Sequence, residues 1–294
     1  MKLAFLTACV AAFPMVVSAV NADEWKLVWS DEFDKDGLPN SDRWGYEEGF
    51  VRNEESQYYT RERLENARVE GGMLVIEGKK EQFKNKDYKA GSKEWKTRNE
   101  FAGYTAASLT TYQKFNVKYG RIEAKAKIPQ GLGVWPAIWM LGDSRNTGKG
   151  WPVCGEIDIM EFVGKEPSKI HGTAHYSKVG KHKSSGGKLV TEKPFDDFHI
   201  YAVEWSPEKI DFYFDEQKYH TFNVADADEA GYNAFKEQFY ILMNFAIGGQ
   251  WGGKIDDKIL PQKFLIDYVR VYQKTDVPKT DTLKDDAPKA DKKE

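Results

Sequence analysis

Apolar and polar residues alternate in short stretches along most of this 294-residue chain. In Arg121–Ile128 every second residue is apolar, as in a β-strand with one face in a core and the other in solvent. Turn residues such as the Gly71–Gly72 pair separate the stretches. Strands are predicted at Trp25–Trp29, Met73–Ile76, Tyr104–Thr111, Tyr119–Ile128, Gly133–Leu141, Ile170–Tyr176, His199–Trp205, Ile210–Phe214, Phe239–Phe245 and Phe264–Tyr272. A short helix fits only within Asp226–Gln238, so the pattern predicts an all-β sandwich or barrel.

The stretch Gly155–Phe162 departs from this pattern, because Glu156, Asp158 and Glu161 interrupt an apolar run. Plain alternation places Glu156 and Asp158 on one face of a strand and Glu161 on the other. A β-bulge at Ile159–Met160 adds one residue and returns Glu161 to the face of the other two. The outer carboxylates are then expected about 5 Å apart, the separation that a retaining glycosidase uses.

Three crowded carboxylates have other uses, namely a metal site or a plain charged surface. The intervening residues Ile157, Ile159 and Met160 need a core on one side, which argues against a plain surface. No histidine is interleaved with the acids, and a calcium loop would bring Gly, Asn and Asp instead of an apolar strand. Carboxylates that face one way repel each other and must split their pKa values, which favours acid–base catalysis.

A glycosidase also needs aromatic faces that hold sugar rings. Trp135 and Trp139 are four residues apart and share one face of a predicted strand. The glycine-rich loop that contains Gln250 and Trp251 could lie against a ligand, and Asn53 belongs to a polar and aromatic loop suited to hydroxyl contacts. We expect His175 to pair with Asp158 in the cleft, whereas His171 fits a satisfied polar side chain near the core. Zinc would need a third ligand, which no neighbouring residue supplies.

Charge and cysteine content narrow the class of protein. The formal net charge of -3 argues against a nucleic-acid-binding protein, which would carry a concentrated basic surface. Of the two cysteines, Cys9 lies in the N-terminal apolar run, so Cys154 has no partner for a disulfide bond. Because no histidine in its segment could activate it, we expect Cys154 to be a buried packing residue.

Both ends of the chain differ from the middle. Lys2 is the only charge before an apolar run from Leu3 to about Val17, and small residues follow, which is typical of a secretory signal peptide. A membrane anchor is the alternative, but the run is shorter than the ~20 residues of a span and Pro14 interrupts it. We therefore expect residues 1–22 to be a signal peptide and the mature protein to be secreted, extracellular or periplasmic, without a membrane span.

The last segment, residues 274–294, contains six Lys, six acidic residues and no aromatic residue. It cannot bury enough apolar surface to order itself, so we predict a disordered tail. A linker to another module or a surface-binding arm is the alternative. The folded domain is expected at residues 23–273.

The run Glu156–Glu161 resembles the active-site signature of glycoside hydrolase family 16. The residue inserted before the last Glu resembles the laminarinase, agarase and carrageenase branches, and Gly131–Leu141, Trp151–Pro152 and Met243–Gly249 are most similar to endo-β-1,3-glucanases. The resemblance implies a concanavalin-like β-jelly roll, in which two curved antiparallel sheets form a concave substrate cleft. It also implies a monomer that cleaves internal β-1,3 bonds of laminarin-type glucans with retention and needs no cofactor for catalysis.

By this resemblance Glu156 is the nucleophile, Glu161 the acid/base and Asp158 the residue between them. Trp135 and Trp139 would line sugar subsites, and Asn53 would bond sugar hydroxyls. Many family members hold a structural calcium ion on the convex side, and the matching positions are Glu32, Gly72 and Asp267.

Two departures from the laminarinase pattern leave the linkage preference open. This chain has Ala107–Leu109 where many laminarinases have an Arg, and Gln250–Gly253 where Asn-Trp-Pro-Gly is frequent. The alternatives are therefore mixed-linkage β-1,3-1,4-glucan, a red-algal galactan and, remotely, a lectin-like module that binds glucan without cleaving it. Sulfated galactans would favour several cleft Arg or Lys, and the predicted cleft segments offer few, among them Arg52.

Overall fold

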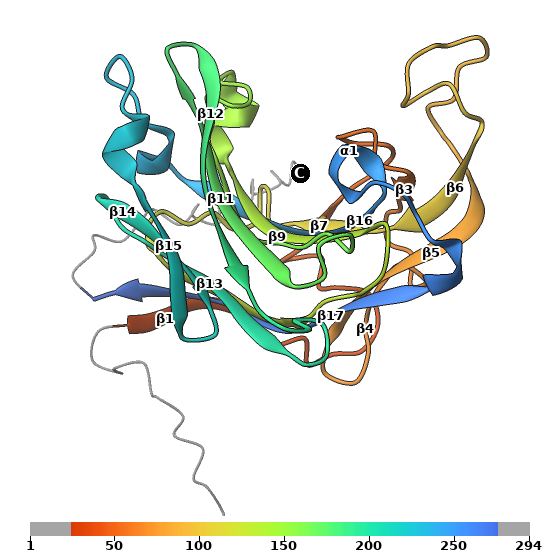
Figure 1. The fold of residues 1–294 in the computed structure, drawn as a ribbon, viewed down its shortest axis with the longest axis horizontal. Helices are drawn as coiled ribbons and strands as arrows, with labels where there is room; N and C mark the ends of the chain where they lie inside the picture. The colour runs from red at the N-terminus through yellow and green to blue at the C-terminus, as the bar shows by residue number, and fades with distance from the viewer. Residues whose placement is uncertain (1–24, 276–294) are drawn as a thin grey trace, which may run out of the picture.

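The computed structural model describes residues 25–275, which form two stacked, curved β-sheets (Figure 1). The expected sandwich is confirmed. The predicted signal peptide at 1–22 and positions 276–294 of the predicted tail lie outside the described residues. Within 25–275, no helix is long and apolar enough to cross a membrane.

The larger sheet has ten strands, and all of its pairs are antiparallel except β3 with β6. Its path is β15-β14-β13-β8-β17-β5-β6-β3, with β1 beside β17 and β4 beside β5. The strands are β1 (Trp25–Asp31), β3 (Gln57–Tyr59), β4 (Ala67–Val69), β5 (Leu74–Lys84), β6 (Phe101–Ala106), β8 (Gly120–Lys127), β13 (His199–Trp205), β14 (Lys209–Phe214), β15 (Gln217–Asn223) and β17 (Gln262–Lys274).

The smaller sheet has seven antiparallel strands in the order β12-β11-β10-β9-β16-β7-β2. They are β2 (Gly45–Glu47), β7 (Ser108–Thr110), β9 (Val134–Gly142), β10 (Glu156–Glu161), β11 (Lys169–Lys178), β12 (Lys181–Val190) and β16 (Phe239–Ile247). Helical turns occupy connections: η1 (Asp143–Thr147), η2 (Val224–Ala227), η3 (Ala234–Lys236), α1 (Gly249–Gly252) and η4 (Asp257–Ile259).

Sequence and structure disagree in a few places. The short helix allowed within 226–238 occurs only as 3-10 turns, namely the end of η2 and the whole of η3. Between them Gly231 has a φ of 78°, which no right-handed helix adopts, so a longer helix does not form. Five strands were not predicted: β2, β3, β4, β12 and β15. The first three have three residues each, too few for a pattern, whereas β12 and β15 lie at sheet edges and carry few buried apolar side chains. Strand β17 runs to Lys274, one residue past the expected domain end.

Side-chain alternation in the smaller sheet separates the core from the opposite face. In β9, Ile138 and Met140 join the main core between the sheets, whereas Trp139 and Leu141 belong to a second cluster on the other face. Strand β16 repeats this division, with Met243 in the main core. The second face of the smaller sheet is therefore free to line a groove.

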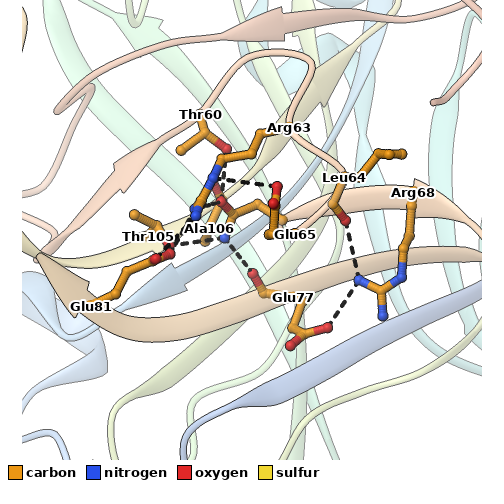
Figure 2. Close-up of polar contacts among 10 residues, drawn as sticks. Thr60, Arg63, Leu64, Glu65, Arg68, Glu77, Glu81, Thr105 and Ala106 are labelled. Atoms are coloured by element: carbon orange, nitrogen blue, oxygen red, sulfur yellow. Dashed lines mark hydrogen bonds and ion pairs between the residues drawn. The ribbon is translucent and has the colours of Figure 1, made fainter. Parts of the chain in front are cut away.

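A buried polar cluster centred on Asn66 ties the segment after β3 to β5 and β6. Figure 2 shows the side chains around it, among them Thr60, Arg63 and Thr105. The Asn66 amide nitrogen donates to the Glu77 carbonyl and to Thr105 Oγ1, both at 3.0 Å. Its oxygen accepts from Thr60 Oγ1 at 3.0 Å and from Arg63 Nη1 at 2.6 Å. Because the side chain satisfies all of these groups away from water, it holds the connection from β3 to β4 in one arrangement.

Candidate active site

The predicted bulge lies in β10 and gathers the three acids on one face. In the pairing with β9, Asp158 is opposite Trp139 and Met160 is opposite Ile138, so Ile159 is the extra residue. Ile157, Ile159 and Met160 all reach the main core. Glu156, Asp158 and Glu161 consequently face the groove together, and all three line it. The expected spacing of about 5 Å between the outer carboxylates stays a prediction.

Burial dominates the electrostatics of the three acids. Burial and, to a smaller extent, the charge of Asp158 raise the pKa of Glu156 to about 8, against the opposing effects of His175 and Arg52. Burial likewise raises the pKa of Asp158 to about 8. The pKa of Glu161 lies well above its usual range, because the side chain is desolvated and faces the charge of Asp158. At neutral pH the trio therefore keeps protons and carries fewer than three charges.

Two side chains contact this trio directly. The Trp135 indole nitrogen donates to Glu161 Oε1 at 3.0 Å, which leaves the second oxygen of Glu161 to carry a proton. His175 Nε2 lies 3.0 Å from Asp158 Oδ2 and 3.9 Å from Glu156 Oε1, so the predicted pairing of His175 with Asp158 is confirmed. This contact is not aligned as a straight hydrogen bond, and Asp158 Oδ2 has no well-directed donor.

A groove passes over the acids and continues on both sides of them. On one side a cavity of about 270 Å³ lies over β9 and β16. On the other side a cavity of about 650 Å³ lies over β11 and β12. The side chains common to both cavities are Asn53, Trp135, Trp151, Glu156, Asp158 and Glu161. The acids thus sit in the middle of one elongated site.

Hydrogen bonds connect the first cavity to the loop before β3. The Trp139 indole nitrogen donates to Asn244 Oδ1 at 2.7 Å, and the Asn244 amide donates to the Tyr59 hydroxyl at 2.9 Å. That hydroxyl donates to the buried Glu55 at 3.1 Å, and Asn53 donates to the same carboxylate at 3.2 Å. The predicted sugar contacts Trp139 and Asn53 are therefore held by one continuous network.

Arg52 lines the first cavity together with Trp139. Its guanidinium lies over the Trp139 ring, 4.8 Å from the centroid, and its charge pairs with Glu47. Arg145 lines the same cavity, and Lys188 lines the second one. The groove thus carries more cations than the sequence suggested, since Arg145 and Lys188 come from segments that were not assigned to it.

Of the remaining residues considered in the sequence, some line the groove and one does not. Trp251 lies in α1 and packs edge-on against Trp135, with ring centroids 5.4 Å apart, and against His171 at 5.0 Å. His171 itself lines the second cavity, so the expectation of a core position for it is wrong: an odd-numbered residue of β11 faces the groove as His175 does. Gln250 is exposed and lines neither cavity; only its backbone nitrogen takes part, donating to the Asn53 carbonyl at 3.0 Å.

Several groove residues escaped prediction. Glu55, Arg145, Asn244 and His182 belong to segments whose role depends on tertiary contacts. Trp151 had a signal, because it precedes the acidic run by five positions, and its side chain is 49% exposed in the groove. Cys154 is buried and free as expected, and burial raises its pKa to about 11, which suits packing and not nucleophilic attack.

Comparison with known proteins places this geometry in a family. A sequence model described as glycosyl hydrolases family 16 matches residues 60–270. The chain belongs to that family. It is 43% identical to a beta-glucanase of Rhodothermus marinus over 86% of each chain, and 36% identical to a glucan endo-1,3-beta-glucosidase of Cryptopygus antarcticus over 82% of this chain and 88% of that protein. The protein is accordingly a glycoside hydrolase.

Solved structures agree on the jelly-roll fold. The laminarinase from Rhodothermus marinus superimposes with a TM-score of 0.73 at 41% identity, covering 85% of this chain and 98% of that one. A structure from work on endo-acting O-glycanases that human gut microbiota express to initiate mucin breakdown gives a TM-score of 0.80 at 38% identity. That superposition covers 86% of this chain and 92% of the other.

Two places in this family 16 enzyme could be considered for a metal ion. Glu156, Asp158 and His175 each place one donor atom within 4.8 Å of the others, but family 16 catalysis needs no cofactor and we give this cluster no metal role. For the expected calcium, strand register brings Asp267 of β17 near the turn that precedes β5 and near the end of β1. The Asp267 carboxylate is however paired with Lys125 at 2.8 Å, so an ion there must displace Lys125.

Proposed function

We propose that the protein is a secreted endo-hydrolase of laminarin-type β-1,3-glucans that works by double displacement with retention. The observation that carries the proposal is the bulged strand, which aims three acids at the middle of a groove open on both sides of them. Cleavage inside a polysaccharide needs sugar subsites on both sides of the reacting bond. The sequence similarity to glucan-cleaving relatives supports the choice of β-1,3-glucan.

In this proposal Glu156 attacks the anomeric carbon while Glu161 donates its proton to the leaving oxygen. The Trp135 N–H on Glu161 Oε1 orients the acid and strengthens its bond when Glu161 becomes a carboxylate, which prepares Glu161 to deprotonate water in the second step. Asp158 lies within hydrogen-bonding reach of Glu156. When Asp158 holds the proton, the contribution of its charge to the raised pKa of Glu156 disappears and only the contribution of burial remains, which favours the ionised Glu156 that acts as the nucleophile.

A second candidate is an endo-hydrolase of galactose-containing glycans, including mucin O-glycans. The favouring observation is the TM-score of 0.80 to the structure from the O-glycanase work, against 0.73 for the laminarinase. The groove cations Arg52, Arg145 and Lys188 would also suit an acidic glycan or a sulfated algal galactan.

A reducing-end assay on laminarin, lichenan, agarose, carrageenan and mucin glycans separates these candidates. We expect the fastest release from laminarin, with a ladder of short oligosaccharides as the first products. Faster release from mucin glycans or agarose would overturn the glucan assignment. Proton NMR of the first product from laminarin should show the β-anomer, and an initial α-anomer would refute retention.

Secretion and calcium are also proposed. Mass spectrometry of protein recovered outside the cytoplasm should give a chain that begins near Asp23, and an intact Met1 would contradict this.

If calcium binds at Glu32, Gly72 and Asp267, chelation should lower the melting temperature without changing kcat at low temperature, because the site lies on the larger sheet and not in the groove.

A further inference from the structure

Strands β11 and β12 form a hairpin at the edge of the smaller sheet, next to β10 (Figure 1). This hairpin brings a second histidine to the acid cluster. His182, near the start of β12, places its Nε2 2.9 Å from Nδ1 of His175. His175 presents its other nitrogen to Asp158 at 3.0 Å. The two imidazoles therefore form a line from the exposed hairpin to the buried centre of the trio.

Trp151 completes the surroundings of His182. The Trp151 ring lies 4.7 Å from the His182 ring and 6.4 Å from that of His175. All three side chains line the second cavity. No acidic side chain of the described residues pairs with His182; its ionisable neighbour is His175, and β11 and β12 from Lys169 to Val190 contain no Asp or Glu. The hydrogen bond to His175 is thus the polar contact that defines the place of the His182 ring.

Hydrogen-bond counting allows two arrangements of this contact, which differ in the tautomer of His175. Two ring nitrogens 2.9 Å apart share one proton, so one donates and the other accepts. If His182 Nε2 donates, neutral His175 must carry its own hydrogen on Nε2 and donate it toward Asp158 Oδ2. Asp158 is then free to point its proton at Glu156. With the opposite tautomer, His175 Nε2 would accept, and the Asp158 proton would turn away from Glu156.

We propose that His182 is a positioning residue of the hydrolytic reaction: it sets the tautomer of His175, so that His175 donates to Asp158 and Asp158 donates to Glu156. The proposal rests on the proposed roles of the acids. The contact between His175 and Asp158 is not yet straight in the structure without substrate, which is common for catalytic hydrogen bonds before substrate binds. A ring fixed on its far side by His182 has only a small rotation to make.

Kinetic measurements on two His182 variants test the proposal. The substrate is whichever glycan of the reducing-end assay the wild type cleaves fastest. His182→Phe keeps a ring beside Trp151 but removes the hydrogen bond. We expect kcat to fall about 10-fold, the lower end of the losses known for hydrogen-bond partners of metal-bound histidines, while KM changes less than about twofold. His182→Gln keeps a donor near the position of Nε2 and should recover most of kcat. An unchanged kcat in His182→Phe, or equal losses in both variants, would overturn the proposal.

A double-mutant cycle separates action through His175 from damage to the hairpin. In a His175→Ala background, adding His182→Phe should cost nothing further, because the partner through which His182 acts is gone. Full additivity of the two losses would contradict the proposal. His199→Phe is the matched control: His199 also has one hydrogen-bonded nitrogen, 2.8 Å from Asp215, and an aromatic neighbour, Phe214, at 4.5 Å, but it lies on β13 of the other sheet.

Imidazole nitrogen NMR gives a readout that does not depend on any substrate. The chain has five histidines, so single variants suffice to assign the His175 signals. We expect a protonated Nε2 and an unprotonated Nδ1 for His175 in the wild type, and loss of this pattern in His182→Phe. A His175 ring with Nδ1–H in the wild type would refute the tautomer. If the wild type cleaves none of the glycans but shows the expected tautomer, the substrate assignment fails and the histidine geometry stands.

Discussion

Two buried polar clusters in this enzyme are built on opposite principles. The groove trio crowds Glu156, Asp158 and Glu161 on one strand, and burial raises the pKa of each. The cluster around Asn66 also contains a carboxylate, Glu81, but Arg63 lowers its pKa through two hydrogen bonds at 2.6 and 3.0 Å. The groove trio concentrates like charges, whereas the cluster around Asn66 pairs its carboxylate with a cation.

The difference has a thermodynamic consequence. Acids whose pKa is raised by folding bind protons that the unfolded chain would release, so the folded state loses stability as pH rises above about 4.5. An acid whose pKa is lowered does the reverse: its stabilisation is present above about 4.5 and is lost as pH falls. We infer that the trio is kept for chemistry at a cost in stability, whereas the Asn66 cluster serves the fold.

The largest expected effect comes from replacing a carboxyl group of the trio with an amide. Glu156→Gln or Glu161→Gln should lower kcat by roughly 10³-fold or more, because an amide can neither attack carbon nor transfer the proton. Rates come from the reducing-end assay, with Glu204→Gln in the larger sheet as the control for the substitution itself.

An activated aryl glycoside sharpens the assignment of the two acids. Its leaving group departs without a proton, so it should rescue the first step of Glu161→Gln but not that of Glu156→Gln. A near-native rate for either variant on polysaccharide, or rescue of Glu156→Gln, would contradict the assignment.

The next largest effect is expected in the cluster around Asn66. Asn66 is 0% exposed, and Asn66→Ala removes one buried hydrogen bond from each of Thr60, Arg63, Thr105 and the Glu77 carbonyl. We expect a loss of about 3 kcal/mol in the free energy of unfolding, measured by urea denaturation. Asn99→Ala, the same substitution at an exposed position, should change it by less than about 0.5 kcal/mol. An equal loss in both variants would show that the Asn66 network adds nothing.

The two clusters also differ in how far the sequence predicts them. The trio was predictable because acids inside an apolar run violate strand alternation, and the bulge that reconciles them follows from counting residues. Nothing comparable marks Asn66, whose hydrogen-bond partners are 3 to 39 positions away in the sequence. Its most distant partner, Thr105 of β6, comes near it only in the folded sheet. The same limit hid Asn244, which contacts Tyr59 across 185 positions.

The strands also show how far structure can be predicted from this sequence. The central strands β9 and β16 could be predicted because their residues are mostly apolar, whereas the residues of the edge strand β12 are mostly polar. Because β12 was not predicted, its residues His182 and Lys188 were not assigned to the groove. Gln250 was wrongly placed in the groove for a related reason: a glycine-rich loop does not reveal which way a side chain points, and here the backbone makes the contact.

A smaller effect should appear in the pH dependence of stability. Glu156→Gln removes a group that is expected to ionise near pH 8 when folded and near 4.5 when unfolded. Its gain in unfolding free energy should therefore be largest at pH 8 and above and should vanish near pH 4. Urea denaturation across this range measures it, and a gain that is independent of pH would show that the amide packs better and that charge is not the cause.

The smallest expected effect tests the opposite sign in the Asn66 cluster. Arg63→Met removes the cation that lowers the pKa of Glu81, so the variant should lose about 1 kcal/mol at pH 7, and the loss should shrink as pH falls below 4.5 and Glu81 becomes protonated. Lys80→Met, which breaks an exposed pair with Asp257, is the control and should leave the stability curve unchanged. If the Arg63→Met loss grew on acidification, the carboxylate would not be the group that Arg63 stabilises, and the contrast between the two clusters would rest on the groove alone.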